Sequence, residues 1–142
     1  HEDIHMDEKD MVQQRMELWH KAVFEKDPKA LDEILSPNVV LHSPFVWRPK
    51  DTKNKTRFIL ENVIEVLEDF KYNRKIINGK QWALEFSAHV GDMQVKGIDL
   101  IEFDDNWQIR YFEVFVRPFK GLMALAEGMN KRIEAAGGEP KD

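Results

Sequence analysis

The sequence contains no cysteine, which excludes disulfide bonds, thiol catalysis, iron–sulfur clusters and cysteine-ligated zinc. No apolar run approaches the roughly 18 residues that a membrane-spanning helix needs, and no charged leader precedes a long apolar stretch. The net charge is only −5, so the chain has no strong positive field to attract phosphate groups. These absences favour a cytoplasmic protein that binds neither nucleic acid nor membranes.

A chain of 142 residues has the length of one domain and can bury roughly 70% of its unfolded surface. Nine Phe, four Trp and two Tyr supply more rigid apolar area than a minimal core needs, which is compatible with a small internal cavity. We expect residues 1–5 to be a cloning remnant and residues 6–142 to form a single domain.

Hydrophobic periodicity and turn signals divide the chain into helices and strands. Asp27 and Pro28 have the sequence signature of a helix start. Asn78-Gly79 and Gly91-Asp92 predict tight hairpin turns. The pattern predicts helices over 7–26, 28–35, 56–70 and from 119 onward, and strands over 39–42, 71–77, 80–90, 93–103 and 107–117. We therefore expect an α+β fold, with a curved, cone-shaped antiparallel sheet packed against N-terminal helices and an additional C-terminal helix.

The segment from Gly97 to Ile109 reads GIDLIEFDDNWQI. Together with the order helix, helix, short strand, helix and meander, it resembles the nuclear transport factor 2-like superfamily, and within it the SnoaL-like branch. This resemblance implies a conical fold with an apolar pocket and a few polar groups at its bottom, which isomerases, cyclases and epoxide hydrolases share. The chain departs from the epoxide hydrolases because strand 82–89 lacks their Arg-x-Asp pair. The epoxide hydrolases and the cyclases share an Asp near the end of the last strand. This chain has Arg117 there and departs from both groups.

The turns also predict which side chains share a face of the sheet. The Gly91-Asp92 turn places Phe86 opposite Gly97 and Leu84 opposite Asp99. For the next turn we expect a three-residue loop, 104–106, with Asn106 in the left-handed region, which places Asp99 opposite Tyr111. A slip of one residue would reverse every assignment on the last strand. The expected concave face then carries Trp82, Leu84, Phe86, Ala88, Val95, Gly97, Asp99, Ile101, Phe103, Tyr111, Glu113, Phe115 and Arg117.

Polar residues on this apolar face are the candidate catalytic groups. Burial raises the pKa of a carboxyl toward values useful for proton transfer, so Asp99 is the candidate base. Tyr111 and Arg117 are the candidates for stabilising negative charge, and Gly97 would leave room for a ligand. The alternative is a buried structural network of Asp99, Tyr111 and Arg117 without a substrate. The candidate ligand-binding residues are Trp47, Trp82, Phe86, Glu113 and His42.

The sequence thus predicts a protein that binds a small apolar molecule, with an isomerase, cyclase or hydrolase activity that needs no cofactor as one interpretation. A non-catalytic ligand-binding or dimerisation module is the alternative. No cluster of His and carboxylate residues has metal-ligand spacing, so no metal site is expected. The convex face is expected to include Ile98, Leu100, Phe112, Val114 and Val116 among its apolar residues, which predicts a homodimer through that face.

Overall fold

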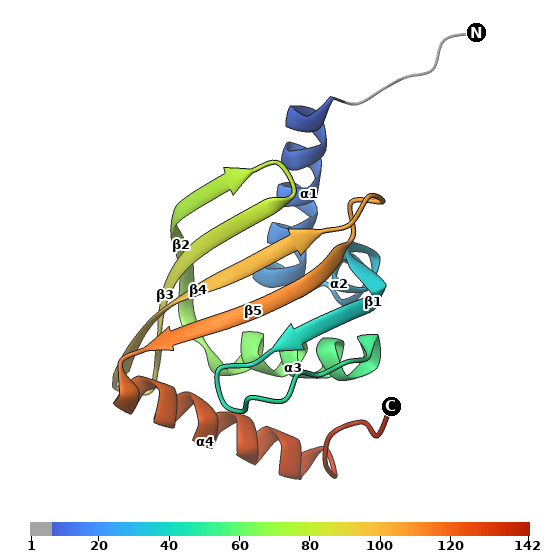
Figure 1. Ribbon diagram of the computed structural model, residues 1–142. Helices are drawn as coiled ribbons and strands as arrows, with labels where there is room; N and C mark the ends of the chain where they lie inside the picture. The colour runs from blue at the N-terminus through green and yellow to red at the C-terminus, as the bar shows by residue number, and fades with distance from the viewer. Residues whose placement is uncertain (1–6) are drawn as a thin grey trace, which may run out of the picture.

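The computed structural model describes residues 7–142, so the expected cloning remnant at 1–5 lies outside the described residues. Four helices and five strands follow one another along the chain (Figure 1). Their bounds are α1 Glu8–Phe24, α2 Pro28–Ile34, β1 Leu35–His42, α3 Lys53–Val66, β2 Glu68–Asn78, β3 Gln81–Val90, β4 Met93–Phe103, β5 Ile109–Arg117 and α4 Phe119–Ala135.

Side-chain caps explain where the helices begin. The Asp27 carboxylate accepts hydrogen bonds from the backbone N–H groups of Lys29 and Ala30, so α2 starts where the sequence predicts. Helix α3 starts earlier than predicted because Thr52 caps it by accepting from the N–H of Lys55. Helix α3 also ends earlier than predicted, at Val66, so β2 starts early, directly after the single residue that follows α3.

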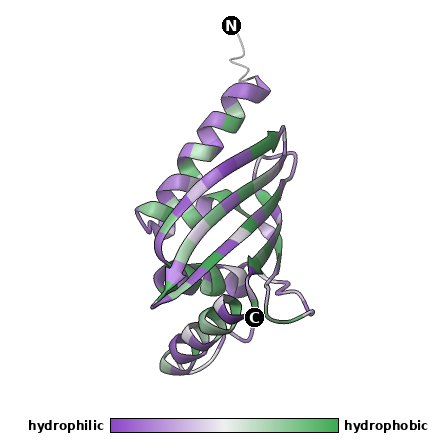
Figure 2. Cartoon of the chain, turned by 90° about the vertical axis from the view of Figure 1, so that its left-hand side faces the viewer, coloured by the Kyte–Doolittle hydropathy of each residue, from purple (hydrophilic) through white to green (hydrophobic). Residues whose placement is uncertain are grey.

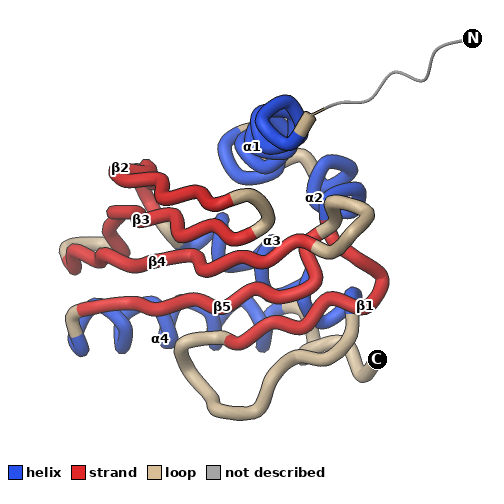
Figure 3. Tube along the Cα trace, turned by 45° about the horizontal axis from the view of Figure 1, so that its top comes forward, coloured by secondary structure: helices blue, strands red, loops and turns tan. Residues whose placement is uncertain are grey.

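The five strands form one sheet in the order β1-β5-β4-β3-β2. The neighbouring pairs β2–β3, β3–β4 and β4–β5 are antiparallel, whereas β1 runs parallel to β5, so the sheet is mixed. The strands bend into one curved layer, and in Figure 3 the helices α3 and α4 lie behind it. The predicted α+β fold class, with a curved sheet, N-terminal helices and an additional C-terminal helix, is confirmed.

The register between β3 and β4 is the predicted one. Phe86 lies opposite Gly97, and Leu84 lies opposite Asp99. The first hairpin turn falls one residue later than predicted, because Asn78 pairs with Gln81 and the turn residues are Gly79 and Lys80.

The register between β4 and β5 differs from the prediction, and this reverses the faces of β5. Asp99 lies opposite Val114 and not opposite Tyr111. Phe103 pairs with Ile109, so the loop before β5 is longer than the expected 104–106, and a bulge between Glu102 and Phe103 shifts the pairing by one further residue. The left-handed residue of the preceding loop is Trp107, with a φ of 56°, and not Asn106.

The concave face packs against the helices and holds most of the core, whereas the convex face is free of helices (Figure 2). Buried concave side chains come from every central strand and include Trp82, Leu84, Phe86, Val95, Ile101, Phe103 and Phe112. Among the helices of residues 7–142, we find none with the length and apolar character needed to cross a membrane.

Candidate functional site

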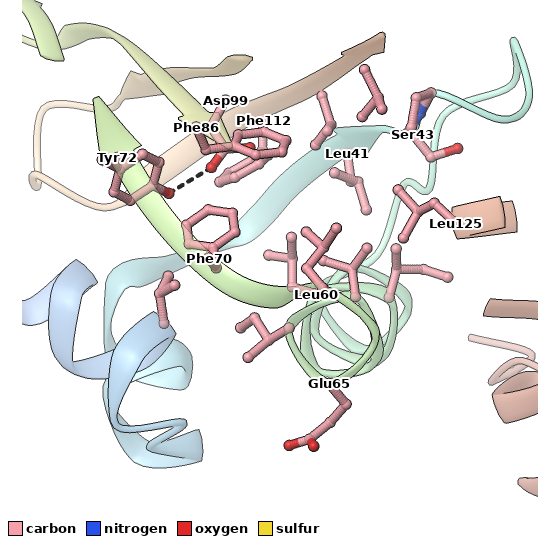
Figure 4. Close-up of a pocket in the computed structure, with 18 of the residues that line it drawn as sticks. Leu41, Ser43, Leu60, Glu65, Phe70, Tyr72, Phe86, Asp99, Phe112 and Leu125 are labelled. Atoms are coloured by element: carbon pink, nitrogen blue, oxygen red, sulfur yellow. Dashed lines mark hydrogen bonds between the residues drawn. The ribbon is translucent and has the colours of Figure 1, made fainter. Parts of the chain in front are cut away.

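A cavity of about 500 Å³ lies between the concave face of the sheet and the helices. Helices α1, α3 and α4 contribute to its walls together with strands β1 to β5 (Figure 4). Most lining side chains are apolar, namely Trp19, Val23, Phe24, Leu41, Pro44, Phe45, Ile59, Leu60, Val63, Ile64, Leu67, Phe70, Phe86, Phe112, Val114, Val116 and Leu125. A volume of this size is typical of pockets that enclose small molecules.

Three polar side chains from three different elements meet in the wall of this cavity. The indole Nε1 of Trp19 on α1 lies 2.9 Å from the hydroxyl oxygen of Tyr72 on β2. That hydroxyl lies 2.6 Å from Oδ2 of Asp99 on β4 (Figure 4). Asp99 is only 6% exposed, although it carries a carboxyl group. The rings of Phe70, Phe24 and His20 pack around Tyr72 and hold it in place.

The donors and acceptors of these three groups fix the direction of the hydrogen bonds. An indole N–H can only donate, so Trp19 donates a hydrogen bond to the Tyr72 oxygen. The hydroxyl proton of Tyr72 is then free to point at Asp99, whose Oδ2 accepts it. Within residues 7–142, no side chain or backbone N–H donates to the second oxygen, Oδ1. Asp99 Oδ1 is therefore the atom left for an additional partner.

Burial sets the proton affinity of this carboxyl group. Removal from water raises the pKa of Asp99 to about 7, and the hydrogen bond from Tyr72 opposes this rise. Burial and the neighbouring Asp99 raise the pKa of Tyr72 well above its usual value, so this phenol keeps its proton. Near neutral pH the site holds a carboxyl group that exchanges its proton readily, next to a tyrosine that does not.

Charged residues of the cavity gather at its exposed rim. Lys26 forms an ion pair with Glu65, with 3.3 Å between Nζ and Oε2. The rim also includes Glu68 and Asp69, and Asp69 Oδ2 lies 2.6 Å from Nε2 of His89. Among residues 7–142, no three His, Asp or Glu side chains come together in an arrangement that could hold a metal ion. Asp99 is thus the buried carboxyl of the cavity, and the others meet solvent.

Comparison with solved structures places this chain in a family. A steroid delta-isomerase from Pseudomonas aeruginosa is 38% identical, with a TM-score of 0.85, over 89% of this chain and 93% of that one. The chain belongs to the nuclear transport factor 2-like superfamily, in its SnoaL-like branch. An uncharacterised bacterial protein with a cystatin-like fold from Silicibacter pomeroyi is 29% identical to this SnoaL-like chain, with a TM-score of 0.82 and 87% of each chain covered.

More distant structures share only the fold with this SnoaL-like chain. A nuclear transport factor 2-like protein of unknown function from Cytophaga hutchinsonii is 16% identical, with a TM-score of 0.61, over 86% of this chain and 99% of that one. No protein-family model and no curated protein sequence matches the chain. The family is therefore established through solved structures.

Two of the residues predicted for the site line the cavity of this SnoaL-like chain, namely Asp99 and Phe86. Trp82 does not: its ring is buried against Phe103, and its Nε1 donates to the carbonyl of Gly79 at 3.0 Å. Trp47 does not line the cavity either and is 97% exposed.

His42, at the end of β1, does not line the cavity, and Tyr111, Glu113 and Arg117 lie on the wrong face of the sheet because of the slipped β4–β5 register. Tyr111, Glu113 and Arg117 alternate with the cavity residues Phe112, Val114 and Val116 along β5, so they project from the convex face. The hydroxyl of Tyr111 donates to Glu113 Oε1 at 2.6 Å, and the ring of His42 lies 5.2 Å from the Tyr111 ring. The predicted network of Asp99 with Tyr111 and Arg117 is therefore wrong.

Gly97 also differs from its predicted role. A side chain at Gly97 would collide with the carbonyl oxygen of Phe115, and it would lie 2.5 Å from the ring carbon Cζ of Phe86. The space beside Gly97 is thus filled by Phe86 and not left for a ligand. The glycine shapes the cavity indirectly, by letting the Phe86 ring approach the backbone of β4 closely.

The roles of Trp19 and Tyr72 in this site are not predicted from the sequence. Tyr72 pairs with Phe86, which the sequence predicts on the concave face, so this pairing is the signal that points to Tyr72. Two irregularities in the β2–β3 pairing, on either side of Tyr72, prevent this pairing from being derived from the hairpin turn. Trp19 lies in the helix predicted over 7–26, where an indole normally indicates core packing alone.

Proposed function

We propose that this chain binds a neutral, mainly apolar molecule whose carbonyl oxygen meets Asp99 inside the cavity. The observation that carries the proposal is a single buried carboxyl, with one oxygen engaged by Tyr72, in a cavity of about 500 Å³ with mainly apolar walls. The likeness to a steroid delta-isomerase supports a steroid-like ligand.

The hydrogen-bond directions support a role for Asp99 as a hydrogen-bond donor to the ligand. Because Oδ2 accepts from Tyr72, the proton of a neutral Asp99 lies on Oδ1. From there it donates to a ligand carbonyl and polarises it, as carboxylic acids kept neutral by apolar sites do. Polarisation makes the hydrogens on the carbon next to the carbonyl more acidic, which is the first requirement for moving a neighbouring double bond.

The protonation state of Asp99 then decides which ligands bind. A ketone needs the neutral carboxyl, whose fraction falls once the pH exceeds the pKa of about 7. The affinity for a ketone should therefore decrease by roughly tenfold per pH unit above this pKa. A phenol can donate to the ionised carboxylate, so its affinity should not show this loss.

Titration calorimetry with progesterone, a neutral diketone, and estradiol, a phenol, tests this assignment between pH 5.5 and 9. We expect progesterone to lose affinity above neutral pH. The Asp99→Asn variant should bind progesterone without this pH dependence, because the amide N–H₂ donates at every pH, whereas Asp99→Leu should bind it weakly. Progesterone affinity that is the same for the wild type and Asp99→Leu would refute the role of Asp99.

Turnover is tested separately from binding. A steroid ketone whose double bond lies one position away from conjugation gives a conjugated product, which is followed by ultraviolet absorbance. A wild-type rate above that of Asp99→Leu assigns an isomerase activity to the cavity. Tight progesterone binding without turnover would identify the chain as a ligand-binding module, the second function that the sequence indicated.

A further inference from the structure

Ser43 and Asp99 lie on the same row of the concave face, two strands apart. His42, the last residue of β1, pairs with Glu113 in the parallel ladder, so the next residue, Ser43, lies level with Val114 on β5. Val114 in turn lies opposite Asp99 on β4. All three residues of this row line the cavity, and Figure 4 shows Ser43 on the segment after β1.

The row separates its two polar residues by an apolar gap. Neighbouring strands are about 4.8 Å apart, so two spacings place the backbone of Ser43 about 10 Å from that of Asp99. The residue between them is Val114, whose side chain offers only methyl groups to the cavity. A ligand that lies across Val114 can therefore reach both polar side chains at once, through two polar atoms with an apolar part between them.

The hydroxyl of Ser43 has a proton to donate, whereas the other uncharged donors of the wall are engaged. Trp19 donates to Tyr72, and Tyr72 donates to Asp99. Ser43 Oγ accepts from the backbone N–H of Phe45 at 3.4 Å, which leaves its own proton. Among residues 7–142, no acceptor takes that proton. The Ser43 hydroxyl and Asp99 Oδ1 are therefore the two uncommitted hydrogen-bonding groups that the described wall offers to a neutral ligand.

We propose that Ser43 determines the specificity of the cavity by donating a hydrogen bond to a second oxygen of the ligand, about one ring away from the carbonyl that meets Asp99. This inference rests on the proposed function, because it takes the carbonyl at Asp99 as given. It narrows the ligand to a compact molecule with two oxygen functions, such as a bicyclic diketone or hydroxyketone. A ketone without the second oxygen leaves the Ser43 hydroxyl unpaired in the complex and therefore binds less tightly.

Two bicyclic ketones test this role, namely decalone, which has one keto group, and the decalindione that carries one keto group on each ring. NMR titration at pH 5.5 measures both affinities while Asp99 is protonated, because its pKa is about 7. The diketone should bind the wild type about tenfold more tightly. About fivefold of this preference comes from the hydrogen bond to Ser43. The remaining factor of two arises because either keto group of the diketone can meet Asp99.

Ser43→Ala should reduce the preference for the diketone to about twofold, whereas Ser43→Thr keeps the hydroxyl and should retain most of the preference. Ser36→Ala is the matched control. Ser36 also precedes a proline and accepts from the N–H two residues later, that of Asn38, at 3.1 Å, but it does not line the cavity. This variant should leave the preference unchanged. A preference that survives Ser43→Ala, or its absence in the wild type, would overturn the inference.

Failure of the proposed function gives a different result in the same titrations. Asp99→Leu should weaken the binding of both ketones, since each places a carbonyl at Asp99. If Asp99→Leu binds both as the wild type does and Ser43→Ala still loses the preference, the role of Asp99 is refuted and that of Ser43 stands. If Asp99→Leu loses both affinities and Ser43→Ala keeps the preference, Ser43 alone is refuted. A wild type that binds neither ketone would also overturn the inference.

Discussion

The hydroxyl of Tyr72 lies 2.6 Å from Oδ2 of Asp99, and this contact joins the two longest strands of the molecule across β3. Because Trp19 donates to the same hydroxyl, the proton of Tyr72 points at Asp99 and not at a ligand. Hydrogen bonds arranged in a chain strengthen one another in a site of low dielectric constant. Tyr72 therefore tunes Asp99, while Asp99 itself is the group that meets the cavity.

Replacement of Tyr72 by Phe should raise the pKa of Asp99 further above 7. The hydroxyl stabilises the carboxylate, and a hydrogen bond to a charged group is worth about 1.5–3 kcal/mol, so the expected rise is roughly one pH unit or more. Infrared or NMR titration of the carboxyl group measures it. Tyr111→Phe removes the other tyrosine, on the convex face, and should leave this pKa unchanged. An equal shift in both variants would contradict the direct contact.

The free energy of unfolding should decrease as the pH rises from about 4 to 7. In the folded chain burial raises the pKa of Asp99 from 3.8 to about 7, so the folded state binds a proton that the unfolded state has already lost. The stabilisation is complete below the unfolded pKa and is lost as the pH passes through the folded pKa. Over this range Asp99→Asn should gain stability relative to the wild type, by on the order of 3 kcal/mol.

Urea denaturation at pH 4 and pH 8 measures this difference. Asp105→Asn is the matched control, since the Asp105 side chain is fully exposed and lies 3.6 Å from Nζ of Lys80. Its stability relative to the wild type should not change with pH in this way. If the two variants follow the same pH dependence, Asp99 does not titrate as a buried group.

The sequence predicts the site correctly where strand pairing is set by a local turn, and incorrectly where tertiary contacts set the pairing. Gly91, with a φ of 57°, forms the expected β3–β4 turn, and this turn alone places Asp99 on the concave face. The β4–β5 loop follows tertiary contacts instead: Trp107 adopts a φ of 56° while its ring packs near Phe103 and Lys80. Asn106 has the better intrinsic preference for that conformation, so the preference of single residues gave the wrong register.

The contacts of Tyr72 show a second limit. Its partners Trp19 and Asp99 are 53 and 27 residues away in the chain, and nothing in local spacing joins them. The fold class, in contrast, depends on periodicity and turn residues that are present in short segments, and these were sufficient. Long-range side-chain networks require coordinates, even when one of their members is identified from sequence.

The pKa of His89 should lie above the usual value of 6.5, and the pKa of His20 should lie below it. Both ring nitrogens of His89 face acceptors, Asp69 Oδ2 at 2.6 Å and the Gly91 carbonyl at 2.9 Å, which favours the doubly protonated ring and raises its pKa. Burial, and then the neighbouring Lys75, lower the pKa of His20. NMR titration of the imidazole signals, assigned with His89→Gln and His20→Gln, measures both values.

The contribution of His89 to stability follows from the raised pKa. It is fully present below the unfolded pKa of about 6.5 and is lost as the pH rises through the folded value. Asp69→Asn should bring the pKa of His89 back toward 6.5, because it removes the largest cause of the rise. A His89 pKa that is insensitive to Asp69→Asn would show that this hydrogen bond does not hold in solution.

Gly97→Ala should destabilise the fold by about 1–3 kcal/mol, because the added methyl group collides with the Phe86 ring and with the backbone of β5. Phe86→Leu supplies the matched background, since leucine lacks the ring atoms Cζ and Cε2 that lie 2.5 and 2.8 Å from the methyl position. In this background Gly97→Ala should cost less, and a double-mutant cycle by urea denaturation measures the difference. Because Phe86 also lines the cavity, the ring displaced in Gly97→Ala should weaken ligand binding. Equal costs in the two backgrounds would mean that the β5 backbone alone requires the glycine, and that Gly97 has no influence on the shape of the cavity through Phe86.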